Sequence, residues 1–326
     1  MFKAFFKSKQ WALWAYLGGA LLFLVVLTQV WIATQINVWY GEFYNILQQA
    51  QQHKLSDFYD SMIKFSYLAF PAVIIGTFAN YFTRVYALKW REAMTFYYLP
   101  KWRNAKGNIE GSSQRIQEDI FRFARIVESL GLQALKAILT LIAFIPILYG
   151  LSKHVNLPVM TFLNDIDGVL VYISLLISIG GMVISWYVGI YLPKLEYNNQ
   201  KVEAAFRKEL VYAEDNKKSY GGDETIFELF TGIKYNYHRL YLHYGYFDLW
   251  VILYAQFMII APYLIMAPSL FTGAMALGVL IQTSNAFGKV NDSFSLLINN
   301  WTTITELRSV RLRLVEFEKH IDMNTK

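Results

Sequence analysis

Long stretches without any Asp, Glu, Lys, Arg or His dominate this chain. Four of them are residues 10–41, 65–83, 168–193 and 249–288, and a fifth, 129–152, contains Lys136 alone. Each is long enough to cross about 30 Å of hydrocarbon as an α-helix rising about 1.5 Å per residue. The fourth stretch has about twice the length of the second, so it predicts two helices. We place the turn between them near Pro262 and Pro268 and predict six spans.

The predicted architecture is an all-α membrane protein with a single transmembrane domain over residues 1–326. The spans are expected at about residues 11–36, 62–84, 129–151, 168–192, 246–266 and 269–290. Helical periodicity continues beyond the spans, which predicts helical extensions over residues 84–128, 193–245 and 291–320. In the first extension we expect a break near Pro100.

Basic residues predict the orientation of these spans. Most of the 30 Lys and Arg residues fall in residues 1–10, 84–125, 194–244 and 289–326. These segments are the two termini and every second connection between the spans, so they share one side of the membrane. By the positive-inside rule these segments and both termini are expected in the cytoplasm. The formal net charge of +6 then follows from orientation, and we expect no nucleic acid partner.

Several chemistries find no support in the sequence. The chain has no Cys, which excludes thiolate nucleophiles and Cys-ligated zinc, and its five His residues do not cluster. We therefore expect neither a metal nor a cofactor. A phosphate-binding loop requires GxxxxGK[ST]. Gly288-Lys289 is followed by Val290, so we expect no ATP hydrolysis by this chain and no enzymatic activity.

Several blocks of sequence resemble one known family. They are EGSSQRIQEDIFRFARIVESLGLQALKAILTLIAFIPIL at 110–148, LEYNNQKVEAAFRKELVYAED at 195–215, WREAM at 90–94, HYGYF at 243–247 and NNWTTITEL at 299–307. They are similar to the SbmA/BacA family of bacterial inner-membrane peptide transporters. The resemblance implies the transmembrane fold of ABC exporters (type IV), an intertwined homodimer of six-helix subunits without a nucleotide-binding domain, and uptake driven by the proton gradient. The implied substrates are antimicrobial peptides, peptide-derived antibiotics and other peptide-like compounds.

Acidic residues on the predicted extensions are the candidates for proton coupling. Glu196, Glu203 and Glu214 are 7 and 11 residues apart and share one helix face, and Glu110 and Glu128 coincide in phase 18 residues apart. Such rows suit a cavity that loads and releases protons, and the resemblance implies that glutamates along the cavity serve proton-coupled uptake. The complete set of candidates is Glu110, Glu118, Glu128, Glu196, Glu203, Glu209, Glu214 and Glu306.

Ordinary ion pairs are the alternative explanation for these acids. Arg122 follows Glu118 by four residues, Arg125 precedes Glu128 by three, and Arg207 follows Glu203 by four. These are the spacings at which side chains meet on a helix surface.

The last predicted span carries a polar stripe. Because polar groups in lipid must face protein or water, two explanations stay open: hydrogen bonds between helices of the dimer, or the lining of a substrate cavity. The candidate cavity residues are Gln282, Asn285, Lys289, Asp292, Asn300 and Trp301.

Three functions are therefore weighed. The first is a proton-driven importer of peptides that works as a homodimer in the bacterial inner membrane, with lipid as its surroundings. The second is the transmembrane subunit of an ATP-driven transporter with a separately encoded ATPase, which the run YGGDE at 220–224 favours. The third is a membrane enzyme or receptor, for which no convergent set of catalytic residues is found.

Overall fold

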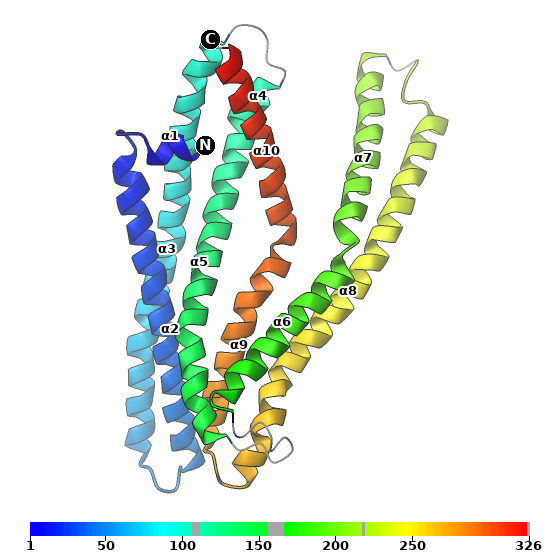
Figure 1. Ribbon diagram of the computed structural model, residues 1–326. Helices are drawn as coiled ribbons and strands as arrows, with labels where there is room; N and C mark the ends of the chain where they lie inside the picture. The colour runs from blue at the N-terminus through cyan, green and yellow to red at the C-terminus, as the bar shows by residue number, and fades with distance from the viewer. Residues whose placement is uncertain (106–110, 156–165, 217–218, 325–326) are drawn as a thin grey trace. The chain divides into compact units, whose positions relative to one another are not determined.

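The computed structural model describes residues 1–105, 111–155, 166–216 and 219–324. These residues form helices and no strand. The elements are α1 (Phe2–Phe6), η1 (Leu13–Gly18) continuing into α2 (Gly19–Gln48), α3 (Leu55–Asn104), α4 (Ser112–Gln114), η2 (Arg115–Asp119) continuing into α5 (Ile120–Leu151), η3 (Ser152–His154), α6 (Val169–Gly189), α7 (Leu192–Asp215), α8 (Asp223–Phe271), α9 (Leu277–Asn299) and α10 (Trp301–Asn324) (Figure 1). The predicted all-α class is confirmed.

Within the described residues, five helical segments are long and apolar enough to cross a membrane. They are Leu13–Gln48, Leu55–Asn104, Ser112–Leu151, Val169–Asp215 and Asp223–Phe271. The sixth predicted span falls on α9, which is not among these five. The helical extensions are present, since helical residues continue beyond each apolar stretch, in the case of Val169–Asp215 as the separate helix α7.

Two predicted helix breaks at proline are wrong. Pro262 and Pro268 lie inside α8, and Pro100 lies inside α3. A proline removes one backbone hydrogen bond but is tolerated within long membrane helices, as at Pro262 and Pro268, where neighbouring groups satisfy the freed carbonyl. Pro100 lies in the last turns of α3, which continues to Asn104. The chain instead turns after Phe271, where Gly273 has a φ of 72°. A left-handed conformation of this kind strongly favours glycine.

Two smaller interruptions also correct the prediction of continuous helices. α6 ends at Gly189 and α7 begins at Leu192, while α9 ends at Asn299 and α10 begins at Trp301. In each case the polar extension is a separate helix from the apolar segment before it.

The chain divides into two compact units, which are described separately. The first unit comprises residues Met1–Leu176 and Pro262–Lys326, and the second comprises Ile177–Ala261. α6 and α8 each contribute to both units.

Two hydrophobic clusters hold the first unit together. One packs α1 and the ends of α3, α5 and α10 around Phe5, Tyr98, Phe123 and Leu314. The rings of Phe5 and Trp90 stack with centroids 5.5 Å apart, so α1 lies against α3 (Figure 1). The other cluster joins the end of α5 and the start of α6 to α9, with Phe287 fully buried.

A close approach of backbones fixes α2 against α9. A Cβ atom built on Gly278 would lie 1.9 Å from the carbonyl oxygen of Gly41, so only glycine fits. The first N–H groups of α9 are also capped by α2: Leu277 donates to Gln48 at 2.7 Å and Gly278 donates to Asn45 at 2.9 Å. These side chains satisfy helix N–H groups that have no partner within the helix.

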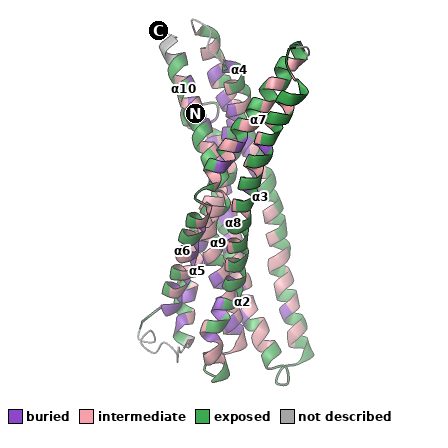
Figure 2. Ribbon diagram, turned by 90° about the vertical axis from the view of Figure 1, so that its right-hand side faces the viewer, coloured by how far each residue is buried: buried purple, intermediate pink, exposed green. Residues whose placement is uncertain are grey.

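The second unit is a pair of long helical segments, α6–α7 and α8. Small residues of α6 face aromatic residues of α8: Gly181 meets Tyr254, and the Ser185 hydroxyl accepts a hydrogen bond from the Trp250 indole at 2.8 Å. Small residues four positions apart are typical of helix contacts in membranes. α7 and α8 present mostly exposed residues along their length (Figure 2).

Candidate functional site

One arginine neutralises two of the predicted proton-coupling acids. The Arg122 guanidinium lies 2.7 Å from Glu118, one turn away on the same helix, and 2.8 Å from Glu306 of α10. The hydrogen bond from Gln114 at 3.1 Å, followed by the interaction with Arg122, lowers the pKa of the Glu118 carboxyl. The ion pair considered as the alternative explanation for Glu118 is therefore present.

Asp119 is a charged residue that the sequence analysis missed. Its carboxylate is buried, and it accepts hydrogen bonds from Arg313 of α10 at 2.7 and 3.0 Å and from Arg115 at 2.8 Å. Burial alone raises the pKa of Asp119, but the two arginines outweigh burial and the net pKa is lowered. The spacing to Arg115 was visible in the sequence, whereas Arg313 lies 194 residues away. This cluster joins α10 to η2, which continues into α5.

Glu128 lies in a different environment. It lines a pocket of about 530 Å³ between α3 and α5, together with Arg84, Arg91 and Arg125. Among the described residues, Glu128 has no ion pair within 4.0 Å and no hydrogen bond, so the close pair with Arg125 that the spacing allowed is not formed. Glu128 is the one acid among the described residues that line this pocket.

The acids of α7 belong to the second unit. α7 is one continuous helix, so Glu196, Glu203 and Glu214 keep the common face that their spacing predicts. Glu196 accepts a hydrogen bond from the Tyr244 hydroxyl at 2.7 Å, and Glu209 accepts one from the Gly221 N–H at 2.9 Å. In the described part of the chain, Glu203 and Glu214 have no hydrogen bond or ion pair. The pair of Glu203 with Arg207 that the spacing allowed is therefore not formed.

Glu110, the eighth predicted acid, lies outside the described residues.

The polar stripe of α9 divides between the bundle and the surface. A Cβ on Gly41 would lie 2.9 Å from the Gln282 amide oxygen, and Asn300 donates to Gln133 of α5 at 3.1 Å, so these two side chains face neighbouring helices. The amide nitrogen of Asn285 is buried without a partner among the described residues. The remaining three residues are exposed: Lys289, Asp292 and Trp301.

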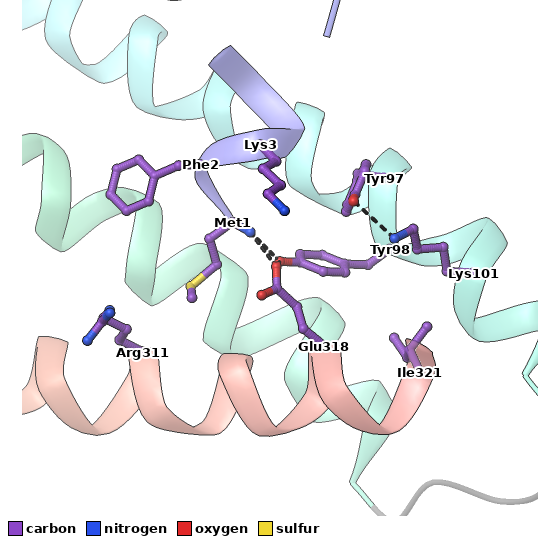
Figure 3. Close-up of a pocket in the computed structure, with 9 residues that line it drawn as sticks. All are labelled: Met1, Phe2, Lys3, Tyr97, Tyr98, Lys101, Arg311, Glu318 and Ile321. Carbon is purple, nitrogen blue, oxygen red and sulfur yellow. Dashed lines mark hydrogen bonds and ion pairs between the residues drawn. The ribbon is translucent and has the colours of Figure 1, made fainter. Parts of the chain in front are cut away.

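A second pocket, of about 290 Å³, lies where α1 meets α3 and α10 (Figure 3). The nitrogen of Met1 donates to the Tyr98 hydroxyl at 2.7 Å and contacts Glu318. Lys101 donates to the Tyr97 hydroxyl at 3.0 Å. We interpret these contacts as the polar part of the packing between α1 and the hydrophobic cluster around Tyr98.

No group of three His, Asp or Glu side chains that could hold a metal ion is found in the part of the chain that the structure describes.

Long apolar helices whose charged residues gather on the segments beyond the apolar stretches define an all-helical, multi-pass membrane protein. The chain belongs to the SbmA/BacA-like family, whose model matches residues 8–322. The resemblance found in the sequence blocks is confirmed.

Two relatives carry the names of ABC transporters. The inner membrane ABC transporter ATP-binding protein YddA of Escherichia coli (strain K12) is 30% identical over 319 residues, which is 92% of this chain and 55% of that protein. ABC transporter D family member 2, chloroplastic, of Arabidopsis thaliana is 28% identical over 327 residues, which is 95% of this chain and 44% of that protein. The chain thus spans about half the length of these relatives.

Proposed function

We propose that this protein imports peptides and peptide-like compounds across the bacterial inner membrane by alternating access, driven by the proton gradient. In this proposal both termini lie in the cytoplasm, and the substrates include antimicrobial peptides and peptide-derived antibiotics. Membership of the SbmA/BacA-like family supports the proposal.

The observation that carries proton coupling is the position of Glu128. Among the predicted acids of the first unit, Glu118 and Glu306 are engaged by Arg122, whereas Glu128 is half-buried in a pocket without a close partner. A carboxylate held by a guanidinium stays ionised over the physiological pH range, but an unpaired carboxylate in a pocket can take up and release a proton as its exposure to water changes. We therefore assign the main proton-binding role to Glu128.

The energy of the gradient is sufficient for such coupling. Each charge moved through 100 mV provides about 2.3 kcal/mol, and a change of one pKa unit corresponds to about 1.4 kcal/mol. A proton carried on Glu128 between the outward-open and inward-open states can therefore change the affinity for substrate severalfold.

Uptake by reconstituted vesicles tests the proposal. Purified protein is placed in vesicles, and entry of a labelled peptide is measured under an imposed pH gradient without ATP. We expect uptake to follow the gradient and to be lost in Glu128→Gln, while Glu228→Gln, at an exposed position without a partner among the described residues, transports normally. Uptake that ignores the gradient contradicts the proposal.

A second function is favoured by the relatives. Both are named ABC transporters and one is named an ATP-binding protein, and this chain spans about half of their length. In that case the protein is the membrane part of an ATP-driven transporter, and the YGGDE turn at 220–224 contacts the ATPase. Uptake that requires ATP and co-purification of a protein with a phosphate-binding loop would identify this function.

The homodimer belongs to the same proposal, and the surface of the second unit supports it. α7 and the first half of α8 carry charged residues too frequently to lie in hydrocarbon. They nevertheless expose large apolar side chains, among them Phe227, Phe230 and Tyr241 with exposed fractions of 74, 50 and 62%. Apolar surface of this kind in water marks a binding interface. We propose that a second copy of the chain covers it.

A further inference from the structure

The pocket between α3 and α5 contains an unusual group of arginines. Arg84 and Arg91 come from α3, where they are seven residues apart on one face, and Arg125 comes from α5. Glu128 is the remaining charged residue of the lining, so three positive charges face one negative charge. No other helix of the described chain contributes to this lining.

No acid of the described residues forms an ion pair with these arginines. Within the described residues, no carboxylate oxygen lies within 4.0 Å of Arg84, Arg91 or Arg125. The Arg91 guanidinium lies 4.7 Å from the centroid of the Phe121 ring, which holds it over an apolar surface. Their neighbours on η2, α5 and α10 differ, since Arg115, Arg122 and Arg313 are each paired with a carboxylate.

The chemistry of the pocket matches a carboxylate that arrives from outside. A guanidinium offers a planar pair of N–H donors that fits a carboxylate with two parallel hydrogen bonds. The volume of about 530 Å³ lies in the range of about 300–1,000 Å³ typical of sites for small ligands. Ala87, Leu88 and Ala124 supply apolar walls on which the residue next to the carboxylate can rest.

We propose that Arg84, Arg91 and Arg125 bind the terminal carboxylate of the peptide substrate, and that Glu128 must take up a proton for this carboxylate to bind tightly. The inference rests on the proposed function, because it assigns a peptide substrate to the transporter. It adds a site for one chemical group of the substrate and a physical link between that group and the proton.

Competition between two carboxylates provides the link. An ionised Glu128 repels an incoming carboxylate and neutralises part of the positive charge, whereas a protonated Glu128 leaves all three guanidinium groups to the substrate. Because coupling between two bound species is reciprocal, the bound substrate carboxylate in turn favours the protonated form of Glu128. Proton and peptide therefore bind together.

Equilibrium binding to the unaltered protein is the first test. The probes are dansyl-labelled penta-alanine with a free terminal carboxylate and the same peptide with a terminal carboxamide; the dansyl group carries no carboxylate. Binding is measured by anisotropy in phosphatidylcholine nanodiscs at pH 5 and pH 8. We expect the acid to bind at least about tenfold more tightly than the amide at pH 5, since hydrogen bonds to charged groups are the strong ones. The preference should decrease at pH 8. If the acid and the amide bind with equal affinity at both pH values, or if neither binds, the inference is overturned.

Variants identify the groups responsible. Glu128→Gln, which cannot ionise, should show at pH 8 the acid preference that the unaltered protein shows at pH 5. Arg84→Gln, Arg91→Gln and Arg125→Gln should each weaken binding of the acid about tenfold and leave binding of the amide unchanged. Arg308→Gln is the matched control, because Arg308 is an exposed arginine of α10 outside the pocket. Equal losses in the control and the pocket variants contradict the assignment.

An anionic lipid phosphate shares the chemistry of a carboxylate, and a second nanodisc composition distinguishes the two. If acid preference is the same in phosphatidylcholine discs and in discs containing phosphatidylglycerol, the peptide carboxylate is the occupant. If phosphatidylglycerol abolishes the preference and the arginine variants lose a lipid-dependent rise in melting temperature, the pocket binds lipid and the inference is wrong. Gradient-driven uptake that does not distinguish acid from amide refutes this inference alone, whereas absence of gradient-driven uptake refutes the proposed function.

Discussion

At the scale of single residues, Asp119 links two distant parts of the chain. Its buried carboxylate is bound by Arg313 and Arg115, so Asp119→Asn leaves two guanidinium groups without their partner. We expect this change to lower the unfolding free energy by about 2 kcal/mol, because hydrogen bonds to charged groups contribute about 1.5–3 kcal/mol and both arginines keep partial access to water. Thermal unfolding in detergent, followed by tryptophan fluorescence, measures the effect. Asp215→Asn, at an exposed end of α7, should change nothing, and an equal loss in both variants would contradict the role of the cluster.

The same carboxylate predicts a dependence on pH. The pKa of Asp119 in the folded protein lies below its ordinary value of 3.8, so its contribution to stability is present in full above that value and is lost as the pH falls through the folded-state pKa. The difference in melting temperature between the unaltered protein and Asp119→Asn should therefore be constant from pH 8 to pH 5 and shrink only below about pH 4. A difference that already varies between pH 8 and pH 5 would show that another group controls it.

Sequence spacing predicted the local part of these contacts and not the distant part. The pair of Glu118 with Arg122 follows from a separation of four residues. The contacts of Arg313 with Asp119 and of Arg122 with Glu306 join η2 and α5 to α10, and no spacing along one helix reveals them. For the same reason the sequence placed Glu128 among several equivalent acids, although the arginines of α3 give it a distinct environment.

At the scale of elements, helix periodicity predicted which segments are helical, whereas proline was a poor guide to where they end. The turn between α8 and α9 coincides with Gly273 rather than with Pro262 or Pro268. Apolar side chains stabilise a membrane helix across a proline, but a reversal of the chain requires a backbone conformation that glycine adopts readily. Glycine was therefore the better signal for this turn.

The packing of α6 against α8 gives a prediction with a neighbouring control. A Cβ on Gly181 would lie 2.1 Å from the Tyr254 ring, whereas a Cβ on Gly180 meets nothing within 4 Å. Gly181→Val should lower the unfolding free energy by about 1–3 kcal/mol, the usual cost of overpacking, and Gly180→Val should have little effect. Adding Tyr254→Ala to Gly181→Val should restore part of the loss. Equal melting temperatures for the two valine variants in detergent would show that α6 and α8 do not pack closely.

At the scale of the whole molecule, the membrane class follows from composition and the family from blocks of sequence, while the division into two compact units appears only in the structure. The cause is physical. Hydropathy reports how a helix partitions into lipid, whereas the units are defined by which helices contact one another, for example α2 with α9 through Gly41 and Gly278.

The proposed homodimer yields the last prediction. Phe227 is 74% exposed near the start of α8 and its neighbour Glu228 is exposed as well, which provides a test position and a control on the same turn. If a second copy covers this face, Phe227→Ser should weaken dimerisation at least about tenfold, since burying a phenylalanine contributes about 1.5–3 kcal/mol. Glu228→Ser should leave it unchanged. Light scattering after size-exclusion chromatography over a range of protein concentrations measures the dimer. A dimer that both variants leave intact would place the interface elsewhere. A monomeric unaltered protein would rule out the homodimer, and the apolar face of α8 would then be open to another partner.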